Sequence, residues 1–366
     1  MTIELFQWAS NLQTAMEKYH NLVQRILRGG HYKKNRTKVD TIADFGHHYE
    51  INLAKGYPLL TTKKMDTFRW DSMLHELVWY LSGDHHVRKL REKTAIWNSW
   101  ADEDGNLPSA YGRFWRRFPI PENKAQLPGE AWASEESPWV QRDDETGTLV
   151  FDQLGYVVDT LKGKNPDRDR HSRRLVVSAW HPANTGPSAL PPCHYTFVIN
   201  VQAGKLNCHL TQRSADIALG VPFNIAAYAL LARVLSEVTD IALGKFSHTL
   251  VDAHIYCGQE ERGEWYSENL SEFQDHLANV NSKEEYRSVR NWVLENAPPE
   301  QTTEVDAGSH NYGYDHVPGL LEQLARDPLD RPRVELDIES LGEFSYENVT
   351  LQDYDSHSDL RFEVAE

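Results

Sequence analysis

The sequence contains little cysteine. Among its 366 residues only Cys193, Cys208 and Cys257 carry a thiol, and no two of them form a C-x-x-C pair. This spacing argues against a disulfide framework and against a metal site built on thiolates, so we expect no metal ion. Isolated thiols fit a reducing compartment, and the sequence therefore predicts a cytoplasmic protein.

The sequence also lacks the marks of a membrane protein. No run of apolar residues approaches the roughly 18 that suggest a membrane-spanning helix. Residues 1–11 do not show the basic start and hydrophobic stretch of a secretory signal. We therefore expect neither a signal peptide nor a membrane partner.

Basic residues are outnumbered by acidic ones. Asp and Glu total 54 against 38 Lys and Arg, which gives a formal net charge of −16. An extended nucleic-acid surface needs the opposite sign, so no specific nucleic-acid partner is predicted. Two interpretations stay open. One is a soluble acidic surface; the other is adaptation to high salt, which is suggested by arginines that outnumber lysines and by an acidic tail.

No internal repeat interrupts the chain, and its length allows one large domain or two ordinary ones. Apolar spacing predicts helices over 3–28, 66–82, 151–161 and 225–238, and strands over 175–180, 196–201 and 206–212. Residues 119–150 are rich in Pro, Glu, Ser and Gly and predict a loop. Residues 262–316 are charged and have only weak helical spacing.

The residue types that carry chemistry are concentrated between residues 190 and 224. Two strands and a turn end at Pro222, where a long apolar helix begins. Cys193 is a candidate nucleophile, and Arg213 is a nearby cation that could lower the pKa of the thiol or hold a phosphate. An inert buried thiol is the alternative. The prolines at 191 and 192 favour the nucleophile, because they stiffen the backbone that presents the sulfur.

Three motifs in this stretch, LPPCH, QRSAD and GVPFNIAAYALL, resemble the thymidylate synthase family at matching spacing. The resemblance extends over most of the chain apart from about 119–150 and 262–316, which we interpret as insertions into a single domain, 1–366. It implies an α/β (α+β) fold, with a large mixed β-sheet surrounded by helices. It also implies a homodimer that forms through the sheet faces.

The activity implied by the resemblance is methyl transfer. A thymidylate synthase converts dUMP to dTMP, and 5,10-methylenetetrahydrofolate supplies both the carbon and the hydride. Dihydrofolate is the second product, and neither a metal nor a nicotinamide is needed. The thiolate of Cys193 would add to carbon 6 of uracil and so make carbon 5 nucleophilic.

A nearly all-apolar helix carries the candidate acid–base residue. Residues 66–82 are apolar almost all round, so the helix is mostly buried, and burial would raise the pKa of Glu76 towards neutrality. The alternative is an exposed glutamate on a polar stripe. The motif HELVWYLSGD resembles the catalytic-glutamate helix of the family, and Tyr111 stands at its active-site tyrosine. Glu76 and Tyr111 would together manage proton removal from carbon 5.

The resemblance also assigns the nucleotide site. Arg36, Arg213 and Ser214 would hold the phosphate of dUMP, and Arg173 and Arg174 would reach the phosphate in the partner subunit's site. The arginine loop departs from the family at residues 38–40, where a glycine-containing run is typical. The remaining nucleotide contacts are Gln212, Asn224 at the base, and His254 and Tyr256 at the sugar.

The folate site follows from the same resemblance. Asp216 would bind the pterin edge, and Lys63 is a candidate for contacting the glutamate tail. The other residues expected to contact the folate are Ile96, Trp97, Leu190, Gly220, Phe223 and, in the closing tail, Ala365.

Two alternative functions remain. A dUMP or dCMP hydroxymethylase on the same fold would let water quench the intermediate, although Trp97 in the folate pocket argues against it. A Cys–His hydrolase or a non-catalytic binding protein is a different class. The adjacent Cys193–His194 pair is poor evidence for a hydrolase, because the base must be near in space and correctly aimed.

Overall fold

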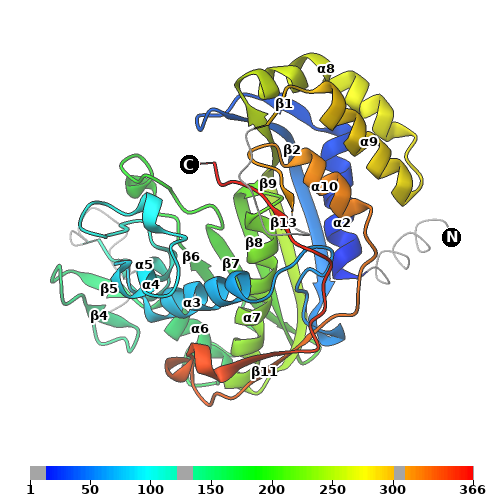
Figure 1. Cartoon of the computed structure of the whole chain (residues 1–366). Coiled ribbons are helices and arrows are strands. Elements are labelled where there is room, and N and C mark those ends of the chain that lie inside the picture. The colour runs from blue at the N-terminus through cyan, green and yellow to red at the C-terminus, as the bar shows by residue number, and fades with distance from the viewer. Residues whose placement is uncertain (1–13, 122–134, 301–309, 366) are drawn as a thin grey trace.

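The computed structural model describes residues 14–121, 135–300 and 310–365, and its centre is a six-stranded sheet (Figure 1). The strand order is β1-β2-β9-β8-β7-β6. Strands β8 and β9 pair in parallel and the other neighbours pair antiparallel, which confirms the expected mixed sheet. The strands are β1 His31–Lys33, β2 Val39–Asn52, β6 Val176–Ser178, β7 Thr196–Gln202, β8 Lys205–Asp216 and β9 Ala242–Gln259.

A tight hairpin joins β7 to β8, as the sequence predicts. Gln202 pairs with Lys205, so the loop has two residues. Both adopt positive φ, 50° at Ala203 and 72° at Gly204. Such turns match the right-handed twist of the strands and fix their register. The hairpin thereby aligns Cys193, just before β7, with Arg213 on β8, whose backbone N–H donates to the carbonyl of Cys193 at 2.8 Å.

Helix α7, Gly220–Thr239, packs on β8 and β9 and also contacts α3, Phe68–Ser82. By length and composition α7 could cross a membrane, but 72% of its apolar window is buried inside the protein. That burial is typical of a core helix. Helix α2, Ala15–Gly29, packs on β2 and begins at a capping box in which Thr14 and Glu17 bond each other's backbone. The part of the predicted helix over 3–13 lies outside the described residues.

A close helix contact builds one wall of the site. Helix α5, Tyr111–Arg116, packs against α3 so tightly that a Cβ at Gly112 would lie 2.2 Å from the carbonyl oxygen of Tyr80. Only glycine fits there. The neighbouring Tyr111 ring therefore lies 5.2 Å from that of Tyr80, between centroids. The other helices are α4 Arg88–Arg91, α6 Gln153–Leu161, α8 Glu260–Ala278, α9 Lys283–Asn296 and α10 Val317–Leu324.

The loop predicted over 119–150 contains strands, so that prediction is wrong in part. Strands β3 Phe118–Pro119, β5 Leu149–Phe151 and β4 Val140–Arg142 form a three-stranded sheet. Each is too short to show an alternating pattern in sequence. Two further pairs are β10 His310–Asn311 with β13 Leu360–Arg361, and β11 Arg333–Leu336 with β12 Val349–Gln352.

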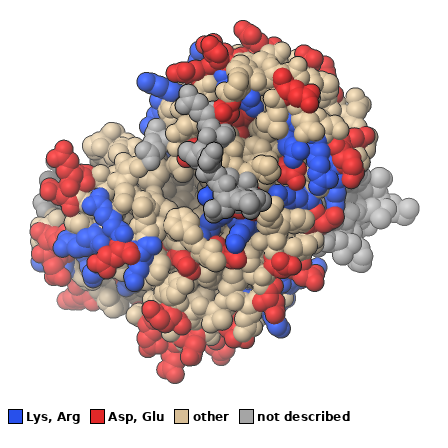
Figure 2. Space-filling model, viewed as in Figure 1, with Lys and Arg blue, Asp and Glu red and all other residues tan. Residues whose placement is uncertain are grey.

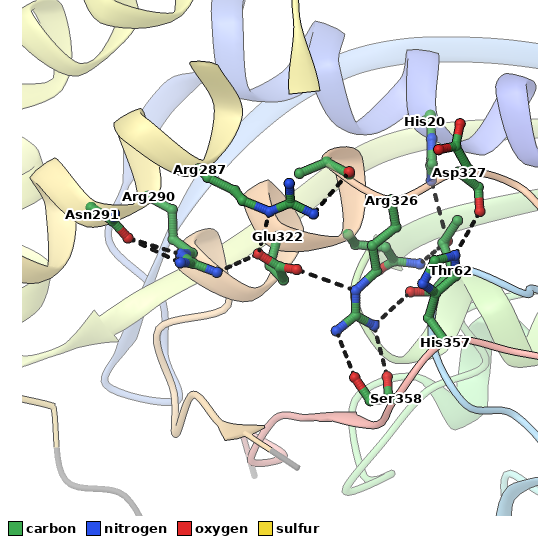
Figure 3. A network of polar contacts seen from close by, with 12 residues as sticks. His20, Thr62, Arg287, Arg290, Asn291, Glu322, Arg326, Asp327, His357 and Ser358 are labelled. Carbon is green, nitrogen blue, oxygen red and sulfur yellow. Dashed lines mark hydrogen bonds and ion pairs between the residues drawn. The ribbon is translucent and has the colours of Figure 1, made fainter. Parts of the chain in front are cut away.

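A polar network ties the C-terminal segment to the body of the protein (Figure 3). Arg326, only 6% exposed, follows α10 and donates to the carbonyl oxygens of Thr62 at 2.9 Å and Ser358 at 2.7 Å. Its guanidinium also contacts Glu322, which in turn pairs with Arg290 of α9. The network therefore joins α9, α10, the turn at residue 62 and the tail.

Acidic side chains are spread widely over the surface. Figure 2 shows carboxylates around most of the outline of the face in view, with Lys and Arg in smaller groups. This distribution agrees with the net charge of −16.

Candidate functional site

A single large cleft gathers most of the predicted site residues. Its volume is about 1220 Å³. Of the residues predicted from the sequence, only Lys63, Arg173 and Arg174 are absent from its lining. Those that line it are Arg36, Glu76, Ile96, Trp97, Tyr111, Leu190, Cys193, Gln212, Arg213, Ser214, Asp216, Gly220, Phe223, Asn224, His254, Tyr256 and Ala365.

Cys193 is the cysteine that faces this cleft, whereas Cys208 and Cys257 are fully buried elsewhere. Its Sγ lies 3.6 Å from Nη2 of Arg213. Burial raises the pKa of the Cys193 thiol, and the guanidinium groups of Arg213 and Arg36 oppose that rise. The expected effect of Arg213 is thus present, but burial outweighs it.

Arg213 is held in place by backbone groups next to the thiol. It donates to the carbonyl oxygens of Pro192 at 2.9 Å and Pro191 at 2.7 Å. Its guanidinium also lies 5.6 Å from the ring centroid of Trp180. Because the two prolines supply these acceptors, the loop that presents Cys193 also positions its cation.

Glu76 is half-buried at the wall of the cleft and is held by two donors. Its Oε1 accepts from the hydroxyl of Tyr80 at 2.8 Å and from Nε1 of Trp97 at 2.7 Å. Burial raises the pKa of Glu76 to about 7, and both hydrogen bonds work in the opposite direction by favouring the carboxylate. A group that titrates near neutrality can both take up and release a proton.

The neighbour of the thiol is a neutral structural histidine. The His194 ring stacks on Tyr111 with centroids 3.7 Å apart, and its Nδ1 bonds the hydroxyl of Tyr228 at 2.8 Å. Burial lowers the pKa of His194 to about 3. Nδ1 is therefore engaged by Tyr228, and within the described part of the chain the ring packs against Tyr111 and Tyr228 without a hydrogen bond to Cys193 Sγ, which argues against a Cys–His hydrolase. The hydroxyl of Tyr111 instead accepts the backbone N–H of Cys193 at 2.8 Å.

Asn224 and Gln212, two of the residues expected to contact the nucleotide, form a hydrogen-bonded pair. Nδ2 of Asn224, in the first turns of α7, donates to Oε1 of Gln212 on β8 at 3.0 Å. A small hollow lined by Glu76, His194 and Asn224 lies beside the cleft. Asn224 and Glu76 thus both line this hollow, together with aromatic and apolar side chains such as Trp115 and Leu231.

The opposite end of the cleft is basic and ends at β9. His254 and Tyr256 pack edge to face with centroids 5.2 Å apart. Asp252, which the sequence analysis missed, lies 3.5 Å from Nδ1 of His254 and pairs with Lys33. In the arginine loop, Lys38 adopts a φ of 61°, a conformation that favours glycine. The departure from the glycine-containing run therefore preserves a glycine-like backbone beside Arg36.

The C-terminal tail contributes to the lining of the cleft that also contains Asp216. Oδ1 of Asp216 accepts the backbone N–H groups of Ala218 at 3.0 Å and Leu219 at 3.3 Å. Nε2 of His316 bonds the carbonyl oxygen of Glu363 at 3.0 Å. The terminal residue 366 lies outside the described residues, and tail residues 362–365 line the cleft.

Lys63 does not reach the cleft. It is completely buried, and its Nζ donates to the carbonyl oxygen of Ala218 at 2.5 Å. Burial lowers the pKa of Lys63 to about 7. Its neighbour Lys64 lines the cleft instead. No sequence signal distinguishes the two adjacent lysines, because the turn that contains them has no periodicity.

Arg173 and Arg174 are exposed on the surface just before β6. Further cleft residues that the sequence analysis did not single out include Arg69 and Arg361, both of which pair with Asp359. Among residues 14–121, 135–300 and 310–365, no group of three or more His, Cys, Asp or Glu side chains could hold a metal ion.

Comparisons with known proteins agree on one family. The sequence profile described as "Thymidylate synthase" matches residues 17–366. A curated protein of Haloferax volcanii named "Thymidylate synthase" is 52% identical over 356 residues, covering 97% of this chain and 98% of that protein.

Proposed function

Because this chain belongs to the thymidylate synthase family and so methylates dUMP to dTMP with methylenetetrahydrofolate, we propose that the cleft around Cys193 is the catalytic site, with Cys193 as the nucleophile. The observation that carries this assignment is the 3.6 Å contact between Cys193 Sγ and Arg213 Nη2 inside the cleft. The hydroxymethylase alternative finds no support in the comparisons.

The first step is addition of the Cys193 thiolate to carbon 6 of the uracil ring. The pKa of the thiol is raised by burial, so loss of its proton depends on the opposing field of Arg213 and Arg36. Addition moves negative charge onto oxygen 4 of the ring. Asn224 can donate to that oxygen through Nδ2, and a donor already held in place stabilises the charge that develops there.

The nucleophilic carbon 5 then forms a bond to the one-carbon unit supplied by methylenetetrahydrofolate, and the proton on carbon 5 must leave afterwards. Glu76 is suited to accept or relay it, because its pKa of about 7 lets it exchange a proton near neutral pH. Burial holds the pKa of Tyr111 well above its usual range, so its phenol stays protonated beside Cys193. Methylenetetrahydrofolate supplies the carbon and the hydride. The role of this chain is to hold the two substrates in register.

The phosphate of dUMP binds at the basic end of the cleft. Arg36, Arg213 and Ser214 of one protomer contact it, and a guanidinium group can bond a phosphate in bidentate fashion. His254 and Tyr256 bind the sugar hydroxyl. Gln212 and Asn224 bind the base.

A homodimer completes the phosphate site, with Arg173 and Arg174 reaching into the partner subunit. Both side chains are exposed and lie directly before β6. Support comes from the open face of the sheet, where alternate residues are half-buried or exposed rather than buried. Val176 is 44% exposed there, and the His48 and His209 rings stack at 5.9 Å across β2 and β8. A second copy would cover this face.

The folate binds beside the nucleotide. Asp216 takes the pterin edge, while Ile96, Trp97, Leu190, Gly220 and Phe223 contact its ring faces and Ala365 closes over it. Lys63 is buried against Ala218, so Lys64 is better placed to meet the charged glutamate tail. The chain as a whole is one domain with insertions at about 119–150 and 262–316, and we place it in the cytoplasm.

Trapping the intermediate tests the nucleophile. Incubation with 5-fluoro-dUMP and methylenetetrahydrofolate should leave a covalent adduct. The fluorine takes the place of the proton on carbon 5, and a base cannot remove fluorine from that carbon. Intact mass and peptide mapping should place the adduct on Cys193. An adduct on Cys208 or Cys257 would overturn the assignment.

A further inference from the structure

A chain of hydrogen bonds links Tyr49 on β2, through His248 and Gln212, to Asn224 on α7. The hydroxyl of Tyr49 bonds Nδ1 of His248 at 2.7 Å. Nε2 of His248 bonds Oε1 of Gln212 at 3.1 Å, and the same oxygen accepts from Nδ2 of Asn224 at 3.0 Å. Tyr49 is 7% exposed, His248 0% and Gln212 2%, so water does not compete for these groups.

A backbone carbonyl determines the direction of every bond in this chain. Nε2 of Gln212 donates to the carbonyl oxygen of Ser214 at 3.0 Å, and a carbonyl can only accept. Oε1 of Gln212 is therefore the acceptor end of its amide. The hydrogen between His248 and Gln212 must then lie on Nε2 of the histidine.

The protonation of His248 follows from its burial. Burial lowers the pKa of His248 to about 3, so the ring is neutral and carries a single N–H. With that hydrogen on Nε2, Nδ1 has a lone pair and accepts the hydroxyl hydrogen of Tyr49. Each donor thus meets an acceptor from Tyr49 through to Asn224.

This order determines which way the Asn224 amide faces. Its nitrogen must face Oε1 of Gln212, because a flipped amide would set two acceptor oxygens against each other beside the almost fully buried Gln212 side chain. Oδ1 and the second N–H of Asn224 remain for a ligand. Together they match uracil, which offers a donor at nitrogen 3 and an acceptor at oxygen 4. Cytosine, with an acceptor nitrogen and an amine, would need the flipped amide.

We propose that Tyr49 and His248 are positioning residues that lock the amides of Gln212 and Asn224 and thereby set the preference for uracil over cytosine. The inference rests on the proposed role of Asn224 as the residue that reads the base. Neither Tyr49 nor His248 is among the residues that line the cleft, so both act through Gln212 rather than by touching the nucleotide.

The test compares binding of two nucleotides to the purified full-length protein. The readout is the dissociation constant of dCMP divided by that of dUMP. His248→Leu removes the donor to Gln212 and should lower this ratio by about five- to tenfold, the value of one hydrogen bond. His248→Gln can still donate to Gln212 and should recover most of the ratio.

Tyr49→Phe keeps the volume of the ring and removes only the far end of the chain. Tyr49→Phe should lower the ratio by less than His248→Leu does. It serves as the test variant if His248→Leu does not fold. Tyr286→Phe is the matched control. Tyr286 is equally buried at 7%, and its hydroxyl accepts from Arg28 on α2. This control should leave the ratio unchanged.

Asn224→Asp distinguishes recognition of the base by Asn224 from the positioning role of His248 and Tyr49. If it leaves the ratio unmoved, Asn224 does not read the base and the proposed function is wrong at that residue. If it moves the ratio towards dCMP while folded His248→Leu does not, the positioning role alone is overturned. An equal drop of the ratio in Tyr286→Phe and Tyr49→Phe would also overturn the positioning role, because loss of any buried hydroxyl would then lower the preference for dUMP.

Discussion

The carboxylate of Glu76 accepts the indole N–H of Trp97 at 2.7 Å, which links a helix residue to one 21 positions later in the chain. The bond favours the charged carboxylate, whereas burial favours the neutral acid and outweighs it. Burial opposed by this bond and by the hydrogen bond from Tyr80 leaves the pKa of Glu76 at about 7.

Trp97→Phe should therefore raise the pH at which the rate changes. Loss of the indole donor removes one of the two hydrogen bonds that lower the pKa of Glu76, so the pKa rises. An inflection in the pH profile of kcat near pH 7 in the parent protein should move up by about one unit, the worth of one hydrogen bond to a charged group.

Trp79→Phe is the control for this shift. The Trp79 ring lies 6.2 Å from that of Trp97 between centroids, and its indole nitrogen has no hydrogen-bond partner in the described part of the chain. The same loss of ring area should leave the inflection in place. A shift of equal size in both variants would mean that packing, and not the hydrogen bond, sets the pKa.

The sequence predicted the residues of this pair but not their contact. Apolar spacing over 66–82 indicated a buried helix around Glu76, and the resemblance supplied Trp97. Which group would meet the carboxylate depends on how residues 94–100 pack against α3, and no local pattern encodes that. The same limit applies to the chain from Tyr49 to Asn224, because Tyr49 and His248 lie on strands remote in sequence from the neighbouring residues Gln212 and Asn224.

Other errors have local physical causes. Strands β3, β4 and β5 are two or three residues long, too short for alternation to be visible. Lys63 and Lys64 look alike in sequence, and only the tertiary structure buries the first of them. By contrast, the continuous stretch 190–224 could be read well, because its turn residues, strand periods and helix start all agree with one another.

Arg326→Met should destabilise the protein markedly. Arg326 is 6% exposed and is the group that bonds Thr62, Ser358 and Glu322 at once. Its loss leaves buried carbonyl oxygens without that donor, so the free energy of unfolding should fall by about 3 kcal/mol. Urea unfolding monitored by tryptophan fluorescence measures this fall.

Lys283→Met provides the comparison, because Lys283 pairs with Asp327 where the side chains are 40% and 75% exposed. A surface pair contributes about 0–1 kcal/mol, so this variant should remain close to the parent. Similar losses in the two variants would contradict the structural role assigned to the network in Figure 3.

Salt should stabilise the protein if the acidic surface is an adaptation to high salt. With a net charge of −16, carboxylates repel one another at low ionic strength, and added KCl screens that repulsion. The thermal midpoint and the rate should both rise from dilute buffer to molar KCl. Sucrose at matched osmolality should not reproduce the rise in rate. A maximum at low salt would reject the adaptation and leave the simpler interpretation of a soluble acidic surface.

The shared phosphate site can be tested by mixing two inactive or impaired proteins. Arg174→Ala keeps Cys193, and Cys193→Ser keeps Arg174. If Arg174 serves the neighbouring protomer, each mixed dimer contains one site with both native groups and one with neither. Random exchange makes about half of the dimers mixed, so about a quarter of the sites should be native. Activity should rise to about that fraction of the parent protein after exchange is verified by native mass spectrometry.

Cys193→Ser mixed with the double variant Arg174→Ala/Cys193→Ser should give no recovery, because no thiol is present. If Arg174 instead serves its own protomer, mixed dimers contain no native site, and the rate will stay at the average of the two parents.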